Sequence, residues 1–165
     1  SLGRAAAVAL RDAGFRGAAM VRSPRPDAIE TFGSDQLDVR LAETDVLENV
    51  LPVTDRTKNL IDALLISKLP PGAAFVNVAR GAHMVYDDLL AALDTGHLRH
   101  AFIDVFRTEP LPTDHRYWQH PRVTLTTHLA APTFPGSGAR FVAEQLDRLE
   151  RGEPLEQLVD HTEGY

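Results

Sequence analysis

Apolar residues recur at helical spacing in some segments of the chain and form short continuous runs in others. Near the start, apolar positions 2, 6, 9, 10 and 13 follow the period of a helix, and Gly14 stands where glycine commonly ends one. The run from Ala73 to Val78 is almost wholly apolar, which is typical of a strand buried on both faces. Over the whole chain the pattern predicts helices at 2–13, 35–43, 60–69, 87–95 and 138–150, and strands at 17–21, 46–51, 73–78, 101–106 and 123–126.

Strands and helices therefore alternate along the chain, as they do in βαβ units. Such units have right-handed crossovers, a parallel sheet and helices on both faces. We expect an α/β fold with a doubly wound parallel sheet, formed as one unit by residues 1–165. Glu48 lies inside the predicted strand at 46–51, where a charge needs a partner or an edge position, and the sequence offers no explanation for it.

Composition narrows the classes of function. The chain has 17 Lys and Arg against 23 Asp and Glu, and its net charge of −6 argues against a general nucleic-acid surface. It has no cysteine, which removes disulfides, thiolate catalysis and cysteine metal sites. His97 and His100 have no third ligand nearby, so we expect no metal site. No apolar run is long enough for a membrane span, so we expect a cytosolic protein without membrane or nucleic-acid partners.

Three polar residues follow separate strands of the predicted sheet. Arg80 comes after the strand at 73–78, Glu109 after the strand at 101–106, and His128 after the strand at 123–126. Carboxyl ends of parallel strands share one edge, where such folds bind ligands. An arginine can hold a carboxylate at two points, and a carboxylate beside a histidine favours the imidazolium and orients the ring. This set predicts reduction of the carbonyl group of an oxo acid.

Four motifs surround these residues, namely Asn77–Gly81, Asp87–Leu93, Asp104–Phe106 with Glu109–Leu111, and Thr127–Ala130. In this order and spacing they resemble the D-isomer-specific 2-hydroxyacid dehydrogenases, and are most similar to the glyoxylate/hydroxypyruvate reductase A group. Support for that group comes from Leu51-Pro52 with Thr54 and Thr57, from the segment 111–124 with Trp118, and from the ending 159–165.

The resemblance implies a role for each member of the set. His128 would be the general acid that protonates the substrate carbonyl oxygen, Glu109 would pair with it, and Arg80 would bind the substrate carboxylate. The family usually has proline before the histidine, whereas this chain has Thr127, which we expect to loosen the His128 loop. The resemblance also implies that Asp104 accepts a hydrogen bond from the nicotinamide carboxamide. The other cofactor contacts it implies are Leu51, Pro52, Val78, Ala79 and Ala130.

The start of the chain matches the end of the family's glycine-rich loop. Ser1, Leu2 and Gly3 correspond to its last three positions, and we expect them to line the amino end of the first helix, where a pyrophosphate binds. The resemblance thus implies a Rossmann-like dinucleotide-binding domain that lacks its first strand and the substrate-binding domain.

The residues after the strand at 17–21 bear on the choice of cofactor. Arg22, Ser23 and Arg25 stand there, and no acidic residue occurs before Asp27. A carboxylate at this place suits the ribose of NAD, whereas cationic and hydroxyl groups suit the 2′-phosphate of NADP. We expect NADP as the preferred cofactor, with NAD as the alternative.

Two classes of function remain open. The first is NAD(P)H-dependent reduction of a small 2-oxo acid such as glyoxylate or hydroxypyruvate, with the isolated chain being a catalytically incomplete fragment. The second is a non-catalytic dinucleotide-binding and oligomerisation module similar to the corepressor relatives of the family. For both, the resemblance implies a homodimer formed through this domain.

Overall fold

The computed structural model describes residues 2–22, 29–132 and 134–159. Helices and strands alternate along most of the chain, as the apolar pattern predicts. The helices are α1 (Leu2–Asp12), α2 (Leu37–Leu41), α3 (Ala63–Ser67), α4 (Tyr86–Asp94) and α5 (Pro135–Glu150). The strands are β1 (Ala18–Met20), β2 (Glu30–Phe32), β3 (Val46–Asn49), β4 (Ala73–Asn77), β5 (Leu98–Ile103) and β6 (Val123–Leu125), and short 3₁₀ turns cover Ser34–Gln36, Gly81–His83 and Arg116–Gln119.

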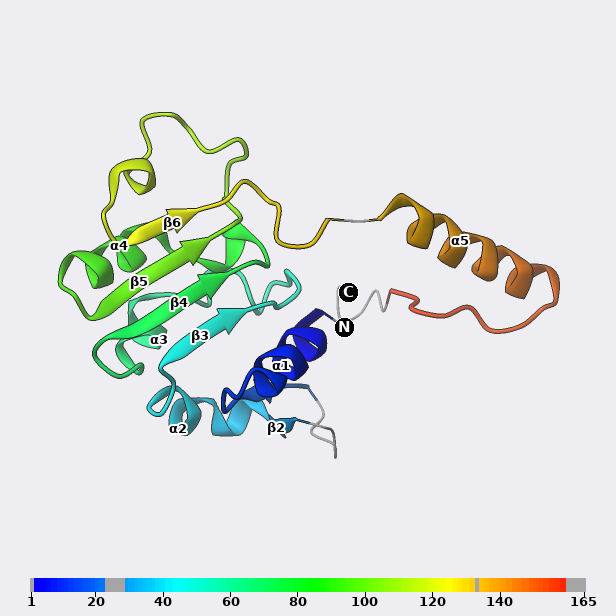
Figure 1. The fold of residues 1–165 in the computed structure, drawn as a ribbon, viewed down its shortest axis with the longest axis horizontal. Helices are drawn as coiled ribbons and strands as arrows, with labels where there is room; N and C mark the ends of the chain where they lie inside the picture. The colour runs from blue at the N-terminus through cyan, green and yellow to red at the C-terminus, as the bar shows by residue number, and fades with distance from the viewer. Residues whose placement is uncertain (1, 23–28, 133, 160–165) are drawn as a thin grey trace.

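The strands pair in two parallel groups. Strands β3, β4, β5 and β6 form a four-stranded sheet in that order, and β1 pairs with β2 in a separate two-stranded sheet. Figure 1 shows the larger sheet as a twisted layer, with α1 and β2 beside the β3 edge. The predicted fold class, a parallel α/β sheet of the doubly wound kind, is therefore confirmed, with the sheet in two parts among the described residues.

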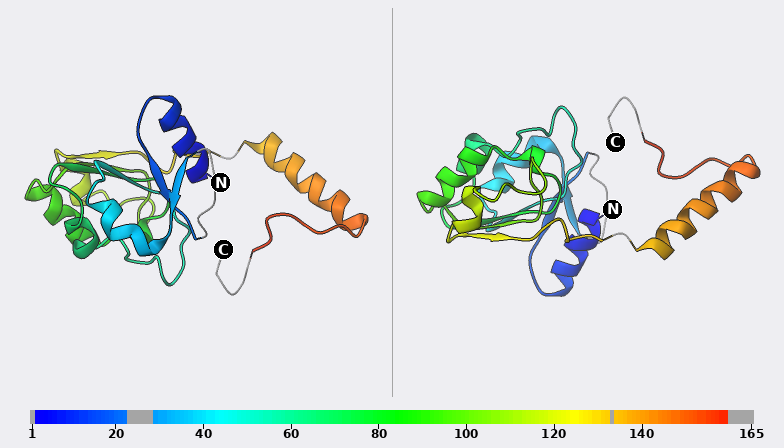
Figure 2. Two further views of the ribbon diagram at one scale, coloured as in Figure 1. Left: turned by 90° about the horizontal axis from the view of Figure 1, so that it is seen from below. Right: turned by 90° about the horizontal axis from the view of Figure 1, so that it is seen from above.

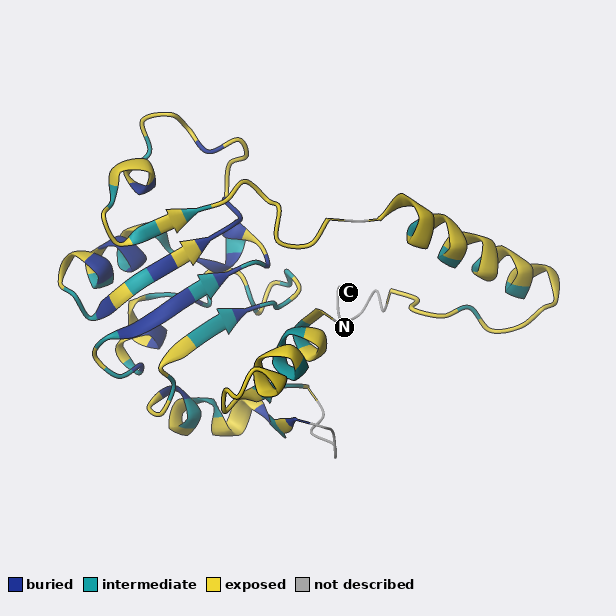
Figure 3. Cartoon of the chain, in the orientation of Figure 1, coloured by how far each residue is buried: buried dark blue, intermediate teal, exposed yellow. Residues whose placement is uncertain are grey.

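The core lies between the larger sheet and helices α3 and α4 (Figure 1). Strand β4 is buried along most of its length, and Phe75 at its centre is 1% exposed. Helix α4 contributes the stripe Leu89, Leu90 and Leu93, whose spacing places all three on one face. Buried residues are concentrated in this core, as the dark blue in Figure 3 shows. The strand ends that carry Arg80, Glu109 and His128 therefore adjoin the best-packed part of the molecule.

Several element boundaries differ from the predicted ones. The helix expected at 60–69 begins only at Ala63, because Asp62 caps it by accepting a hydrogen bond from Leu65 N at 2.8 Å, and Ile61 instead pairs with Met84 as a bridge. The strand expected at 101–106 is β5, Leu98–Ile103, which starts soon after the turn at Gly96. Strand β2 was not expected, since three residues are too few to show an apolar period.

Glu48 lies on β3, an outer strand of the four-stranded sheet. It is half-buried opposite Val76, and burial raises its pKa. The exposed part of the side chain keeps the carboxylate in contact with water, which accounts for a charge inside this strand.

Helix α5 stands away from the body of the molecule in all three views (Figures 1 and 2). It begins at Pro135, whose fixed φ suits the first turn, and none of its residues is buried. Its own tail folds back on it, with Arg148 bonded to Glu156 and Gln145 accepting from the Glu156 amide. No helix in the described ranges is long and apolar enough to cross a membrane.

Candidate active site

The structure brings the three predicted catalytic residues to one edge of the larger sheet. Arg80 follows β4, Glu109 lies in the loop after β5, and His128 follows β6. His128 Nδ1 lies 2.9 Å from Glu109 Oε2, and the Arg80 guanidinium donates to Ala79 O at 2.6 Å. The side chains of His128 and Glu109 are 47% and 37% exposed, so a small molecule in solvent can reach both.

Glu109 is held in its ionised form. Its Oε1 accepts a hydrogen bond from Phe106 N at 2.8 Å, and this bond, followed by the hydrogen bond and charge of His128 and the charge of Arg80, lowers the pKa of Glu109 below its ordinary value. Burial acts in the opposite direction and is outweighed. The ionised Glu109 accepts a hydrogen bond from a proton-bearing Nδ1 of His128, so Nε2 is the ring nitrogen that could face a substrate.

The backbone at His128 adopts a φ of 58°, which is uncommon for a residue other than glycine. Asp104, 3% exposed, holds this conformation. Its carbonyl accepts from His128 N at 2.7 Å, and its carboxylate accepts from the amides of Leu129 and Ala130 at 2.8 and 3.0 Å and from the Thr126 hydroxyl. A costly conformation held this firmly is typical of functional sites.

Asp104 thus has a structural task that sequence reasoning missed. Burial raises its pKa, but the hydrogen bonds from Thr126, Leu129 and Ala130, together with the charge of His128, outweigh burial and leave the pKa below its ordinary value. A carboxylate offers about four acceptor positions, and three are taken here. At most one is left for a nicotinamide carboxamide. These bonds also show what fixes the His128 loop in the presence of Thr127.

Gly81 sets the spacing between the Arg80 loop and the Glu109 loop. A Cβ atom at Gly81 would fall well inside 3.0 Å of the carbonyl group of Phe106 and the amide nitrogen of Arg107. The two backbones therefore touch at a point where no side chain fits.

Arg107 ties the same loops together and was passed over by the sequence analysis. Its Nε donates to Met84 O at 2.8 Å, and its Nη2 reaches Ala82 O at 3.3 Å and Asn59 Oδ1. Its place directly after Phe106, in a loop that follows a buried strand, was the available signal.

Four of the predicted cofactor residues lie along the same edge of the larger sheet. Leu51 and Pro52 follow β3, and Val78 and Ala79 follow β4. A Cβ at Gly3 would lie 2.8 Å from Val50 Cγ2, so the amino end of α1 packs against the segment after β3. Leu2 is exposed at this helix end. Arg22 is exposed just beyond β1, while Ser1, Ser23 and Arg25 lie outside the described residues.

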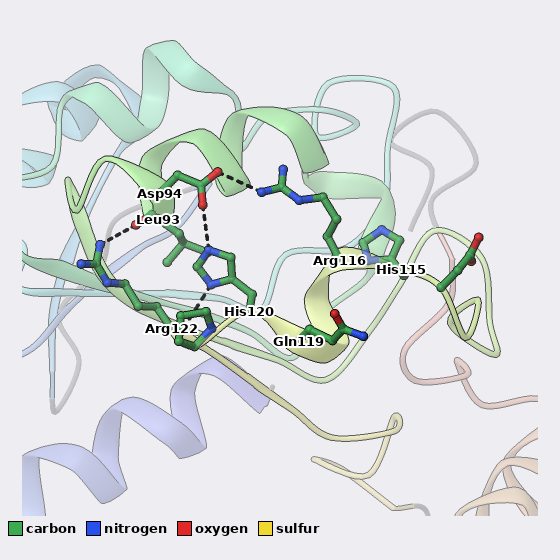
Figure 4. A pocket seen from close by; sticks show the side chains of 9 residues that line it. Leu93, Asp94, His115, Arg116, Gln119, His120 and Arg122 are labelled. Atoms are coloured by element: carbon green, nitrogen blue, oxygen red, sulfur yellow. Dashed lines mark hydrogen bonds and ion pairs between the residues drawn. The ribbon is translucent and has the colours of Figure 1, made fainter.

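Two hollows lie at opposite edges of the larger sheet. A small one of about 60 Å³ is lined by residues at the carboxyl ends of β4, β5 and β6, including Val78, Asp104 and Thr126. A larger one of about 480 Å³ lies between the end of α4 and the turn at 116–119, next to the amino ends of β5 and β6 (Figure 4). The strands are parallel, so the larger hollow is on the opposite edge from Arg80 and His128.

Asp94, Arg116 and His120 bond to one another in the larger hollow (Figure 4). Asp94 accepts from Arg116 at 3.0 Å and from His120 at 3.1 Å, and these two hydrogen bonds lower the pKa of Asp94. Arg122 donates to Leu93 O at 2.6 Å. The charge of Asp94 is thus paired within the fold, and we interpret this part of the hollow as a structural ion-pair cluster.

Comparison with known proteins agrees with this geometry. Residues 1–130 match the family model described as D-isomer specific 2-hydroxyacid dehydrogenase, NAD binding domain. The chain belongs to this family. The predicted resemblance to D-isomer-specific 2-hydroxyacid dehydrogenases is thus confirmed.

Solved structures of this dehydrogenase family superimpose closely on the chain. A D-isomer specific 2-hydroxyacid dehydrogenase from Xanthobacter autotrophicus Py2, in complex with NADPH and MES, has a TM-score of 0.95 and 37% identity over 99% of this chain and 69% of its own. The NADPH-dependent glyoxylate/hydroxypyruvate reductase of Sinorhizobium meliloti, in complex with NADP and sulfate, has a TM-score of 0.96 and 38% identity. That match covers 99% of this chain and 54% of the reductase, so the chain spans about half of the reductase's length.

Proposed function

We propose that this chain is the dinucleotide-binding part of an NADP-preferring reductase that converts a small 2-oxo acid, such as glyoxylate or hydroxypyruvate, to the 2-hydroxy acid. The observation that carries the proposal is the pairing of His128 Nδ1 with Glu109 Oε2 at 2.9 Å, next to Arg80, at the carboxyl edge of the sheet. Kinship with the Sinorhizobium meliloti reductase, whose structure holds NADP, supports the choice of substrate class and cofactor.

The described residues fit a dinucleotide. Helix α1 begins at Leu2, and the amino end of a helix directs backbone amides at a phosphate group. This helix end lies beside the segment after β3, and Val78 and Asp104 border a small hollow further along the same edge. Arg22, beyond β1, is placed to favour a 2′-phosphate.

The chemistry assigned to the side chains follows from their contacts. Arg80 binds the substrate carboxylate and orients the carbonyl group beside it. NADPH, when bound, supplies the hydride that adds to the carbonyl carbon. His128 gives the proton on Nε2 to the carbonyl oxygen. It keeps the proton on Nδ1, which stays hydrogen-bonded to Glu109. The product is the 2-hydroxy acid, and the neutral ring regains its proton from solvent.

A binding experiment tests the cofactor part of the proposal. NADPH and NADH are titrated into the chain by calorimetry, alongside Arg22→Asp and a control, Arg16→Asp, which makes the same charge change before β1. We expect NADPH to bind more tightly than NADH. Loss of charge-assisted hydrogen bonds to the 2′-phosphate should weaken NADPH binding about 10-fold in Arg22→Asp only. Equal affinities for the two cofactors would refute the NADP preference.

An activity assay tests the catalytic part. The oxidation of NADPH is followed with glyoxylate and with hydroxypyruvate, for the intact reductase of which we propose this chain is a part and for its His128→Ala variant. Turnover that depends on His128 would support the reductase. Cofactor binding by the intact protein with no turnover of either acid would favour the non-catalytic dinucleotide-binding module instead. The expected homodimer and cytosolic location belong to the same proposal.

A further inference from the structure

Three buried polar residues lie behind the candidate active site and are not used by the proposed chemistry. Asn49 ends β3, Asn77 ends β4, and His83 ends the 3₁₀ turn that follows Arg80. They are 3%, 0% and 0% exposed. Neighbouring strands β3 and β4 bring the two asparagines opposite each other. Buried polar groups of this kind are costly unless every one is hydrogen-bonded.

Their hydrogen bonds form one connected chain. Asn49 Nδ2 donates to Asn77 Oδ1 at 3.1 Å and lies 3.0 Å from His83 Nδ1. His83 Nε2 lies 3.2 Å from Pro52 O. Because Asn49 Nδ2 is a donor, His83 Nδ1 must accept, and the ring proton must sit on Nε2 and point to the Pro52 carbonyl. The neighbours thus select one tautomer of the ring.

The same three side chains also hold the backbone of both loops. Asn49 Oδ1 accepts from Leu51 N at 3.2 Å, so it fixes the segment after β3. Asn77 Oδ1 accepts from Ala79 N at 3.1 Å, and its Nδ2 donates to Arg80 O at 3.1 Å, so it fixes the segment after β4. The links therefore join the residues expected to face the dinucleotide to the residue expected to hold the substrate.

Only one arrangement satisfies this network. Turning the Asn49 amide over would set Nδ2 against the donor Leu51 N, and would set Oδ1 against the two acceptors, Asn77 Oδ1 and His83 Nδ1. The groups are buried, so water cannot replace the lost partners. A change at one member must disturb both loops.

We propose that Asn49, Asn77 and His83 are positioning residues that lock the loop 49–52 and the loop 77–81 into one register. This role rests on the proposed function, in which the three residues set the distance between the bound nicotinamide and the substrate on Arg80. A misplacement of about 1 Å at reacting groups can cost about 100-fold in rate, which gives such a lock its value.

The first test needs no variant and no cofactor. The imidazole nitrogens of ¹⁵N-labelled chain are observed by NMR, and we expect His83 to carry its proton on Nε2 with Nδ1 unprotonated. A proton on Nδ1 in place of Nε2 would overturn the network as described.

The second test uses His83→Leu, which removes both ring partners, with His100→Leu as the matched control. His100 bonds to Thr124 at 2.8 Å, away from both loops. Amide hydrogen exchange should become about 10-fold faster at Leu51 and at Ala79 in His83→Leu, since each amide loses a firmly held acceptor. His83→Asn, whose carbonyl oxygen can accept from Asn49, should restore protection at both amides. A change confined to the turn at 81–83, or an equal change in the control, would overturn the proposal.

Cofactor titration separates this proposal from the proposed function. If the unmodified chain binds NADPH, His83→Leu should bind it about 10-fold more weakly, and unchanged affinity would refute the positioning role. If the unmodified chain binds no NADPH, the proposed function fails, while the exchange and NMR results still decide whether the two loops are locked.

Discussion

Replacing Gly81 with alanine is the sharpest test of how the site is assembled. Gly81 follows Arg80 and is buried against the backbone of Phe106 and Arg107, in the loop that carries Glu109. The clash would involve backbone atoms, which cannot turn aside as a flexible side chain can. The whole loop after β5 must move away from the loop after β4.

The size of the effect follows from the geometry. A Cβ at Gly81 would lie 2.0 Å from the nearest backbone atom, whereas real Cβ contacts essentially never fall under 3.0 Å, so the loops must part by about 1 Å or more. Forcing one extra carbon into a packed interior costs about 1–3 kcal/mol. For a domain of this size, each kcal/mol lowers the melting temperature by about 2–4 °C.

Thermal unfolding of Gly81→Ala is compared with that of Gly17→Ala, a control where a Cβ meets nothing within 4 Å. We expect a lower melting temperature for Gly81→Ala only, since alanine at a position it can adopt is neutral or stabilising. A Gly81→Ala protein with the same melting temperature as the unmodified chain would refute the close approach of the two loops.

Two further predictions concern single side chains, one in the candidate site and one in the core. In Glu109→Gln, the stability given by the ionised carboxylate is lost. Because the pKa of Glu109 lies below its ordinary value of 4.5 when folded, this contribution is complete above about pH 4.5 and disappears as the pH falls through the folded-state pKa. Urea unfolding should show a deficit of about 0.2–1 kcal/mol at neutral pH, as for an exposed ion pair, and none in acid; a deficit independent of pH would contradict this. Tyr117 is 1% exposed, and its hydroxyl has no partner among the described residues, so Tyr117→Phe should raise stability by up to about 1 kcal/mol in thermal melting, whereas a loss of that size would reveal a missed hydrogen bond.

The elements that the sequence predicts well are those with strong local patterns. The run at 73–78 and the stripe Leu89, Leu90 and Leu93 carry their own apolar periods, and both elements were placed to within a few residues. Helix α3 was overestimated, because its apolar period continues past the point where Asp62 caps it and Ile61 turns into a bridge. Tertiary contacts decided that boundary.

The candidate site was likewise predictable from the sequence only in part. Arg80, Glu109 and His128 could be singled out because each follows a predicted strand, and topology alone brings strand ends together. Their roles stay predictions. The network of Asn49, Asn77 and His83 could not be found, because its bonds cross between residues about thirty positions apart and depend on register and on amide orientation. Gly81 was part of a motif, but its contact with the loop after β5 is visible only in three dimensions.

The order of the larger sheet has a consequence for how the chain folds. Strands β3, β4, β5 and β6 neighbour one another in the order in which they occur in the sequence. Each pairing in this sheet therefore joins consecutive strands, so the loop that it closes is a single crossover connection. During synthesis every new strand can add to an edge that already exists, with no need for a later segment to be inserted between earlier ones. The edge that carries the candidate site is then assembled in sequence, with Arg80 first, Glu109 second and His128 last.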